Sequence, residues 1–363
     1  MLLSSVDVDI STRHLPAFMI NFIVCYKCNL DCSYCDFHDN DYKPLPLDEC
    51  KKSIDFIFKY TDIVLSAKLK HERRMSLNLI GGEPFAHPDI VDILEYIRQV
   101  YVVKYKDNFK LSVCVTTNGI IGPNALARSI DLVDFWTVSY HTEALDKQKE
   151  LTLDTINALY QGKKILEVRV MAPSDPAKFA ESQRVHSQLV NTGVTALMKP
   201  IMGDQYASNQ AGYMKIFWKT KEEIQQYNTA TGITCCSERP LILNEDKNHR
   251  TNFIPDNNFR DWYCALNWNF LSVNHFLEVF LNTHCHVSNQ TNKEEPLGTI
   301  ADADRILKQL QEQIDNKSVP VIQCPKKICH GCGMCAPKAK TKEEMTKIMK
   351  KHLVDVSILD FKE

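Results

Sequence analysis

Six short apolar runs alternate with helix-length amphipathic stretches between residues 18 and 201. The runs are FMINFIV, SLNLI, LSVCVTT, FWTVSY, LEVRVMA and TALMKPI, which begin at residues 18, 76, 111, 135, 166 and 195. Between them, stretches such as PLDECKKSIDFIFKYTDIVL repeat apolar residues every three or four positions, as helices do. Strands that alternate with helices predict a parallel sheet covered by helices. Because the pattern contains no GxGxxG turn, we predict an α/β fold with a partial (β/α)6 TIM-like barrel.

The composition changes after about residue 203 and marks further segments. The stretch WNFLSVNHFLEVFLNTHC alternates like a β-hairpin that turns near Asn274 and His275. A helix with an N-terminal cap at Thr299 is expected to follow it. We therefore predict an N-terminal extension (1–17), the barrel (18–205), a connecting segment (206–260), a small cysteine-rich hairpin-plus-helix domain (261–340) and a C-terminal helix or tail (341–363).

The bulk composition excludes several classes of partner. The net charge is −2, so no whole-protein field indicates binding to nucleic acid or to an acidic membrane surface. No apolar run approaches the roughly 20 residues that a membrane-spanning helix needs. The first residues, MLLSSVDVDISTRH, lack the basic start of a signal peptide. We therefore predict a cytoplasmic protein, whose thiols stay reduced.

The fourteen cysteines are expected to bind metal rather than to form disulfides, because they cluster in a reduced chain. Four lie in CYKCNLDCSYCDF (25–37), and two spacings compete there. Cys25 and Cys28 with Cys32 and Cys35 have the spacing of a zinc knuckle. Cys28, Cys32 and Cys35 alone have the spacing of a three-legged iron–sulfur site, which leaves one iron open to a substrate.

Polar residues end four consecutive strands. IGGEP (80–84) brings adjacent glycines, which permit close approach of a ligand, and Glu83, which can accept from an ammonium group. TTNG (116–119) and VSYH (138–141) end the next two strands. Arg169 could bind a carboxylate with two hydrogen bonds. The carboxyl ends of barrel strands are where such enzymes build their sites, so these residues are suited to hold a zwitterion and its sugar.

The spacing Cys28-x3-Cys32-x-Tyr34-Cys35, followed by Gly81-Gly82-Glu83-Pro84 and then by Thr117-Asn118-Gly119, resembles the radical S-adenosylmethionine (SAM) enzymes. The resemblance covers roughly residues 16–205. It implies a [4Fe-4S] cluster on Cys28, Cys32 and Cys35, with SAM on the open iron and Gly82 and Glu83 beside its amino group. The cofactor-binding residues that it implies are Tyr34, Phe37, Gly81, Gly82, Glu83, Pro84, Thr117, Asn118, Ser139 and Arg169.

The later cysteines resemble the SPASM/twitch extension of many radical SAM enzymes, in which a hairpin and a helix hold auxiliary clusters. The set comprises Cys264, Cys285, Cys324, Cys329, Cys332 and Cys335. We expect one auxiliary [4Fe-4S] cluster on Cys264, Cys285, Cys329 and Cys332, with Cys335 as the alternative ligand. Two clusters, or a structural zinc ion, are the other possibilities. Cys25, Cys50 and Cys114 are expected to be packed thiols.

The resemblance implies that the chain reductively cleaves SAM to a 5′-deoxyadenosyl radical, which abstracts a hydrogen from the substrate. We favour a ribosomally made peptide as substrate, modified by epimerisation, thioether formation or a carbon–carbon crosslink. The peptide could need a separate recognition protein, since the barrel begins near residue 18. A small molecule such as an aminocyclitol or sugar is the alternative, and a non-catalytic iron–sulfur or zinc protein is the alternative of another class. The expected electron donor is a flavodoxin or ferredoxin, and no nucleic acid or membrane partner is expected.

Overall fold

A computed structural model describes residues 18–35, 43–201, 261–265, 268, 270–281, 295–324, 338–350 and 358–362. Its largest sheet has the order β10-β9-β8-β1-β2-β3-β4-β5-β6 within these ranges. The six predicted strands are confirmed, and neighbours among them pair in parallel. They are β1 (Phe18–Cys25), β2 (Arg74–Gly81), β3 (Lys110–Thr117), β4 (Phe135–Tyr140), β5 (Ile165–Ala172) and β6 (Ala196–Pro200).

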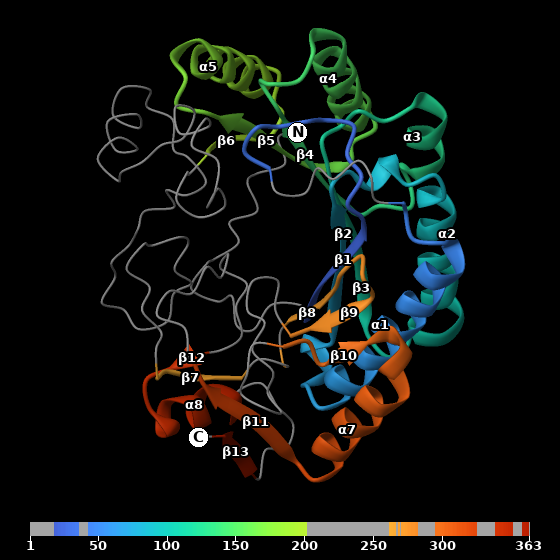
Figure 1. The fold of residues 1–363 in the computed structure, drawn as a ribbon, viewed down its shortest axis with the longest axis vertical. Helices are drawn as coiled ribbons and strands as arrows, with labels where there is room; N and C mark the ends of the chain where they lie inside the picture. The colour runs from blue at the N-terminus through green and yellow to red at the C-terminus, as the bar shows by residue number, and fades with distance from the viewer. Residues whose placement is uncertain are drawn as a thin grey trace.

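One helix follows each of the first five strands and lies along the outside of the curved sheet (Figure 1). These helices are α1 (Leu47–Ser66), α2 (Ile90–Val100), α3 (Pro123–Ser129), α4 (Asp146–Gln161) and α5 (Pro176–Asn191). Their placement, with the parallel sheet, is that of a partial TIM-like barrel, as predicted from the alternation of strands and helices.

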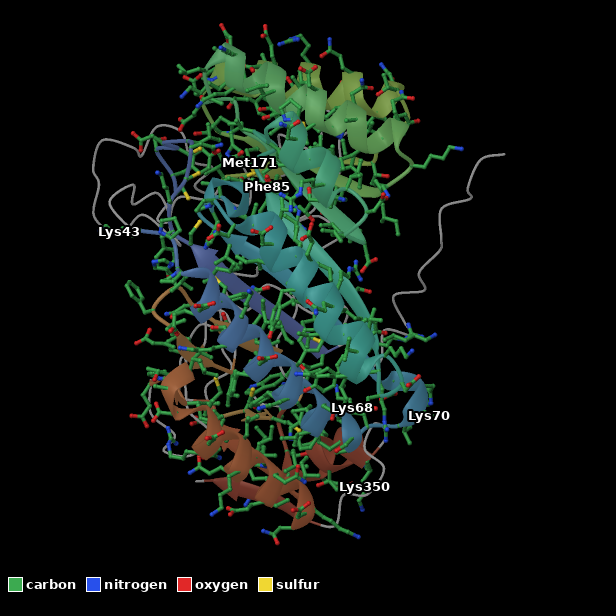
Figure 2. The ribbon with its side chains drawn as sticks, turned by 90° about the vertical axis from the view of Figure 1, so that its right-hand side faces the viewer. Lys43, Lys68, Lys70, Phe85, Met171 and Lys350 are labelled. Carbon is green, nitrogen blue, oxygen red and sulfur yellow. The ribbon has the colours of Figure 1, made fainter. Side chains whose placement is uncertain are left out.

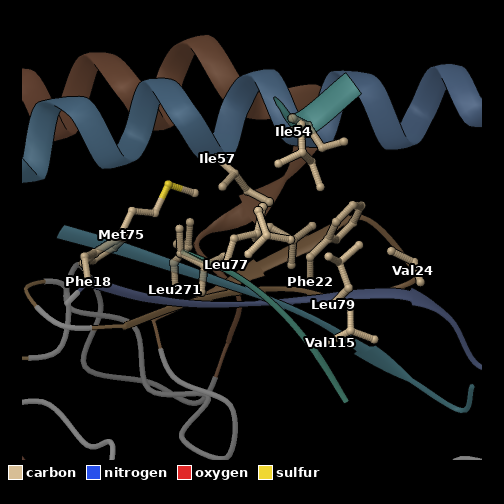
Figure 3. Close-up of a cluster of buried hydrophobic side chains, with 14 of the residues drawn as sticks. Phe18, Phe22, Val24, Ile54, Ile57, Met75, Leu77, Leu79, Val115 and Leu271 are labelled. Atoms are coloured by element: carbon tan, nitrogen blue, oxygen red, sulfur yellow. The ribbon is translucent and has the colours of Figure 1, made fainter. Parts of the chain in front are cut away.

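The core lies between the sheet and the helices. Figure 3 shows Phe22 of β1 and Leu77 of β2 packed beneath Ile54 of α1, and all three side chains are fully buried. Each such side chain contributes roughly 1.5–3 kcal/mol by its removal from water. The opposite face of the same strands carries polar residues, including Asn21 and Asn78. Parallel strands covered on both faces are usually apolar throughout, so this polar inner face is the part of the sheet suited to contact a ligand.

The predicted hairpin is confirmed as β8 (Phe270–Val273) and β9 (Glu278–Phe280), which pair antiparallel. The side-chain oxygen of Asn274 accepts from the backbone N–H of Phe276 and of Glu278, which closes the turn. β8 also pairs in parallel with β1, so the hairpin extends the barrel sheet. β10 (Gly298–Thr299) follows, and Asp302 accepts from the backbone and hydroxyl of Thr299 before α7 (Ala303–Asp315).

A second sheet has the order β12-β7-β11-β13. Its strands are β7 (Tyr263–Cys264), β11 (Ser318–Gln323), β12 (Lys338–Ala339) and β13 (Ile358–Lys362), and α8 (Lys342–Lys350) lies beside it (Figure 1). The predicted extension 1–17 and connecting segment 206–260 lie outside the described residues. No helix within the described ranges combines the length and apolar composition that crossing a bilayer requires.

Lys68 lies just after α1 with 1% of its surface exposed (Figure 2). Its Nζ is 5.9 Å from the ring centre of Phe18 and has no hydrogen-bond partner among the described residues. Burial lowers the pKa of Lys68 from 10.5 to about 8, although Glu72 opposes the shift. Because the folded state holds the proton less tightly, this lysine costs stability at pH 7, and the cost disappears as the pH rises from about 8 to 10.5.

Replacing Lys68 with methionine should therefore raise the free energy of unfolding by about 1–3 kcal/mol at pH 7, because one pKa unit is worth about 1.4 kcal/mol. The gain should shrink toward zero near pH 10.5. Urea denaturation at both pH values measures it. Lys70→Met is the matched control, because Lys70 is exposed on the next turn. A Lys68→Met protein less stable than the wild type at pH 7 would show that the ammonium is favourably placed.

Candidate active site

The cysteine loop begins where β1 ends, at the carboxyl edge of the parallel sheet. Cys32 is buried, Cys28 and Cys35 are partly exposed, and none of the three forms a disulfide. The backbone N–H of Cys35 donates to the carbonyl of Cys32 at 3.0 Å, which forms a turn between two of the predicted ligands. Burial raises the pKa of the Cys28 thiol to about 11 and that of Cys32 to about 12. A bound metal would therefore be needed to hold these thiols as thiolates at neutral pH.

Within the described residues, no three His, Cys, Asp or Glu side chains converge on a point that one metal ion could occupy. A zinc ion needs its four ligand atoms within about 2.0–2.3 Å of itself. A cubane cluster takes its thiolates on different irons, so its ligands need not converge on one point. Three cysteines that form no disulfide, on one loop beside the open sheet edge, fit the second requirement.

The two glycines of GGEP bring the end of β2 against the start of the cysteine loop. The N–H of Gly82 donates to the carbonyl of Cys25 at 3.0 Å, and that of Glu83 donates to Lys27 at 2.9 Å. A Cβ atom at Gly82 would lie 2.3 Å from the carbonyl oxygen of Tyr26 and 2.5 Å from that of Lys27. The close approach seen in the structure is therefore one of backbone to backbone. Pro84 begins the short 3₁₀ helix Pro84–Ala86 that follows.

Glu83 is fully buried and ties the end of β2 to the end of β3. One carboxylate oxygen accepts from the hydroxyl of Thr117 at 2.7 Å and from the N–H of Phe85 at 2.9 Å. The other accepts from the N–H of Asn118 at 2.7 Å. Burial raises the pKa of Glu83 to about 7, and the three donors oppose that rise. The Glu83 carboxylate thus joins the ends of β2 and β3 by hydrogen bonds, and the SAM contact expected of it stays a prediction.

Replacing Glu83 with glutamine should lower the free energy of unfolding by about 1–3 kcal/mol, because a buried donor is left without an acceptor. In either orientation the new NH₂ group faces an N–H donor, either that of Asn118 or that of Phe85. Urea denaturation at pH 8, where the native carboxylate is mostly charged, measures the change. Glu49→Gln, which alters a solvent-facing ion pair on α1, should change little. Equal stability of Glu83→Gln and wild type would contradict a stabilising role for the hydrogen bonds of Glu83.

Asn118 fixes the first half of the cysteine loop. Its side-chain NH₂ donates to Oδ1 of Asn29 at 2.5 Å and lies 3.7 Å from Sγ of Cys28. Gln148 of α4 donates to the carbonyl of Asn29 at 2.9 Å. The residue after Cys28 is therefore bound from β3 and from α4 at once. Asn29 and Gln148 were not predicted from the sequence, because neither belongs to a spaced motif.

The end of β4 contacts the second half of the loop. Nδ1 of the partly buried His141 lies 2.6 Å from the hydroxyl of Tyr34 and 3.4 Å from Sγ of Cys32. The rings of Tyr34 and His141 stack with their centres 6.0 Å apart. Burial lowers the pKa of His141 to about 4, so the imidazole is neutral at physiological pH. Tyr34 thus lies beside a predicted ligand, whereas Phe37 lies outside the described residues.

Glu143, two residues further on, binds Ser33 in the same half of the loop. Its carboxylate accepts from the N–H of Ser33 at 2.8 Å, from the Ser33 hydroxyl at 2.9 Å and from Nζ of Lys178 at 2.8 Å. Burial acts to raise the pKa of Glu143, but the bonds from Lys178 and Ser33 bring it below its ordinary value. The carboxylate is therefore charged at neutral pH. Neither Glu143 nor Lys178 was predicted from the sequence.

Ser139 and Arg169 are register partners on β4 and β5, so their side chains share one face of the sheet. The Arg169 guanidinium donates to Glu167 at 2.7 Å, and both side chains are partly exposed. Further along the inner face, Thr116 donates to Asn78, and Asn78 donates to Asn21, each at 3.3 Å. The sheet therefore presents a row of hydroxyl and amide groups that ends in one ion pair.

The three cysteines expected to be packed thiols are at least partly buried, and one of them, Cys114, lies on the inner face. Cys25 and Cys50 are fully buried, and Cys114 is partly buried. Cys25 donates to the carbonyl of Glu83 at 3.3 Å, so its thiol supports the GGEP turn. Cys114 lies on the inner face, 3.4 Å from the hydroxyl of Ser76.

The family model of the radical SAM superfamily matches residues 22–168, the segment that holds the cysteine loop, GGEP and TTNG. We call residues 22–168 the radical SAM domain, after the family whose model they match. The superfamily consists of enzymes and implies a [4Fe-4S] cluster and SAM as cofactors. The radical SAM domain ends before Arg169, so the match includes Ser139 but not its register partner.

Two curated relatives are similar to the radical SAM domain. The S-adenosylmethionine-dependent nucleotide dehydratase of Selenomonas ruminantium is 25% identical over 141 residues, which are 39% of this chain and 44% of the relative. The GTP 3′,8-cyclase of Clostridium perfringens is 32% identical over 153 residues, 40% of this chain and 41% of the relative. The chain thus matches less than half the length of these curated relatives.

Among solved structures, "Native anSMEcpe with bound AdoMet and Kp18Cys peptide" has a TM-score of 0.53 and 14% identity. The match covers 82% of each chain. At this identity the likeness concerns the fold, which is the partial TIM-like barrel with a parallel sheet of six strands.

Proposed function

We propose that this protein is a radical SAM enzyme that generates a 5′-deoxyadenosyl radical and abstracts a hydrogen atom from its substrate. The observation that carries the proposal is the cysteine loop of Cys28, Cys32 and Cys35, bonded to GGEP at the carboxyl edge of the radical SAM domain. When bound, a [4Fe-4S] cluster would supply the electron that cleaves the sulfonium bond of SAM. The three cysteines would hold three irons and leave the fourth to SAM.

The residues around the loop have distinct roles in this proposal. The backbone edge of Gly81, Gly82 and Glu83 would border the amino group of SAM, and Pro84 would hold the turn that shapes this edge. Ser139 and Arg169 would bind its carboxylate or ribose, since they share the inner face at the ends of β4 and β5. The remaining predicted contacts, which surround the cluster and the nucleoside, are Tyr34, Phe37, Thr117 and Asn118.

We propose that the substrate lies against the polar inner face formed by Asn21, Asn78 and Thr116. Amide and hydroxyl groups there can both donate and accept hydrogen bonds, which suits the backbone of a peptide. A ribosomally made peptide is therefore the favoured substrate, and the fold is also that of a protein whose solved structure holds a peptide. The second candidate is a small molecule. Its support is that both curated relatives act on nucleotides by their names, and a sugar or aminocyclitol would meet the same polar groups.

A deuterium-transfer experiment tests the substrate class. The reconstituted enzyme would be incubated with SAM, reductant and either a perdeuterated peptide fraction or a perdeuterated small-metabolite fraction. Because the radical takes its hydrogen from the substrate, deuterium should appear in 5′-deoxyadenosine with the peptide fraction. If deuterium appears in 5′-deoxyadenosine only with the small-metabolite fraction, the peptide proposal is wrong and a small-molecule substrate is supported.

We also propose one auxiliary [4Fe-4S] cluster beside the second sheet. Cys264 is buried on β7, and the described residues on each side of segment 325–337 pair with that strand. Ile322 of β11 and Lys338 of β12 are both register partners of Cys264. Segment 325–337, between these two strands in the sequence, carries the proposed ligands Cys329 and Cys332 and the alternative Cys335. These three and Cys285 lie outside the described residues, and Cys324 is buried at the end of β11.

The proposed chemistry requires a low-potential electron donor such as a flavodoxin or ferredoxin. A separate recognition protein for the peptide and a cytoplasmic location belong to the same proposal. A non-catalytic iron–sulfur protein would have no use for an open iron site. The formation of 5′-deoxyadenosine therefore separates the two classes.

A further inference from the structure

Glu143 makes a compact set of contacts with the cysteine loop. Its side chain is 10% exposed and lies beyond β4, on the connection to α4. Both carboxylate oxygens accept from Ser33, one from the backbone N–H and the other from the hydroxyl. Two bonds to one residue fix its orientation as well as its position. Ser33 follows Cys32 directly and precedes Cys35 by two residues, so the fixed residue lies inside the turn that joins these cysteines.

Lys178 connects this contact to α5. Its Nζ donates to the Glu143 oxygen that also accepts from the Ser33 hydroxyl. The backbone N–H of Lys178 donates to Asp175, which caps the first turn of α5. A chain of hydrogen bonds therefore runs from the start of α5 through the carboxylate to the loop. Charge-assisted bonds of this kind are stronger and geometrically stricter than neutral ones.

The two halves of the loop are held by different elements. Asn118 and Gln148 bind Asn29, next to Cys28, from β3 and α4. Glu143 alone among the described carboxylates binds Ser33, next to Cys32. The relative placement of Cys28 and Cys32 thus depends on two independent anchors. An iron–sulfur cluster is sensitive to such placement, because supporting groups orient the ligands and tune the metal.

We propose that Glu143 is a positioning residue for the turn between Cys32 and Cys35, and that Lys178 makes this turn depend on α5. The inference rests on the proposed function, in which these cysteines hold the SAM-cleaving cluster. It assigns Glu143 no contact with SAM or with iron. Its effect is exerted through Ser33, by holding the loop ready in the protein before the cluster is assembled.

The test compares Glu143→Ala with Glu181→Ala. Glu181 is a matched control, because its carboxylate also joins a strand-end residue, Tyr140, to a helix lysine, Lys149, and its described hydrogen bonds do not involve the cysteine loop. Amide exchange is measured in the cluster-free protein, and the electron paramagnetic resonance (EPR) spectrum of the reduced cluster is measured in the reconstituted protein. Losing a charged hydrogen bond worth about 1.5–3 kcal/mol should speed exchange at Ser33 by roughly 10–100-fold.

In the reconstituted protein, Glu143→Ala should lower iron retention and change the EPR spectrum both with and without SAM, while Glu181→Ala should match the wild type. Lys178→Met should shift the spectrum in the same direction by a smaller amount. If Glu143→Ala does not fold, Lys178→Met is used in its place. Unchanged exchange and an unchanged spectrum in folded Glu143 and Lys178 variants would overturn the inference. A wild-type protein that forms no [4Fe-4S] cluster would instead overturn the proposed function.

Discussion

Replacing Cys28, Cys32 and Cys35 together with alanine should abolish the formation of 5′-deoxyadenosine from SAM. Alanine offers no ligand, so the proposed cluster of about four irons cannot be held. The fold should survive, because the loop is also held by backbone hydrogen bonds from Gly82 and Glu83 that do not involve these side chains. Iron, sulfide and 5′-deoxyadenosine are measured in both anaerobically reconstituted proteins, with circular dichroism as the check on folding.

The iron content that remains in this triple variant gives the number of auxiliary clusters. About four irons would correspond to one auxiliary cluster and about eight to two. No iron, with bound zinc in its place, would reject the auxiliary cluster. Cys25→Ala is the matched single variant, because the structure has the Cys25 thiol donating to the carbonyl of Glu83. It should keep the full iron content, and loss of the metal in Cys25→Ala would favour the zinc knuckle.

Replacing Gly82 with alanine should reduce SAM cleavage by more than about 100-fold, through displacement of the cysteine loop. The added Cβ would lie 2.3–2.5 Å from two backbone carbonyl oxygens of the loop, and backbone cannot rotate away as a side chain can. Relief requires breaking the bonds from Gly82 and Glu83 to Cys25 and Lys27. Two lost buried hydrogen bonds cost about 1–3 kcal/mol each, which corresponds to the expected factor.

Gly122→Ala is the control for this substitution, because a Cβ at Gly122 would meet nothing within 4 Å. It should leave both the cluster spectrum and the rate unchanged. The rate of 5′-deoxyadenosine formation and the EPR spectrum of the reduced cluster are measured for the two variants and the wild type. If Gly82→Ala behaves like Gly122→Ala, the loop does not depend on the close approach of these two backbones.

The barrel strands were predictable because a parallel strand buried against helices carries a strong local signal. Phe135–Tyr140 is one such run, and its observed bounds equal the predicted ones. The pairing of β8 with β1 was not predicted, although the hairpin was. The signal was present in Phe270–Val273, a short run buried on both faces, which is typical of a strand inside a parallel sheet.

Within the candidate site, motif residues were predictable and their supports were not. The GGEP glycines were expected to allow close approach of a ligand. In the structure it is the backbone of the cysteine loop that approaches them closely. Glu143 is 110 residues from Ser33, and Gln148 is 119 residues from Asn29. A lone polar residue at such a separation has no spacing that one sequence can reveal. Only the fold, which brings the ends of β1, β3 and β4 together, identifies these partners.

The most direct test of the proposed function is SAM cleavage by the anaerobically reconstituted, full-length chain. The protein would be given dithionite and SAM, and 5′-deoxyadenosine would be quantified by mass spectrometry. We expect its formation in the wild type and its absence in the Cys28, Cys32 and Cys35 variant. No 5′-deoxyadenosine from a wild-type protein with its clusters intact would contradict the account.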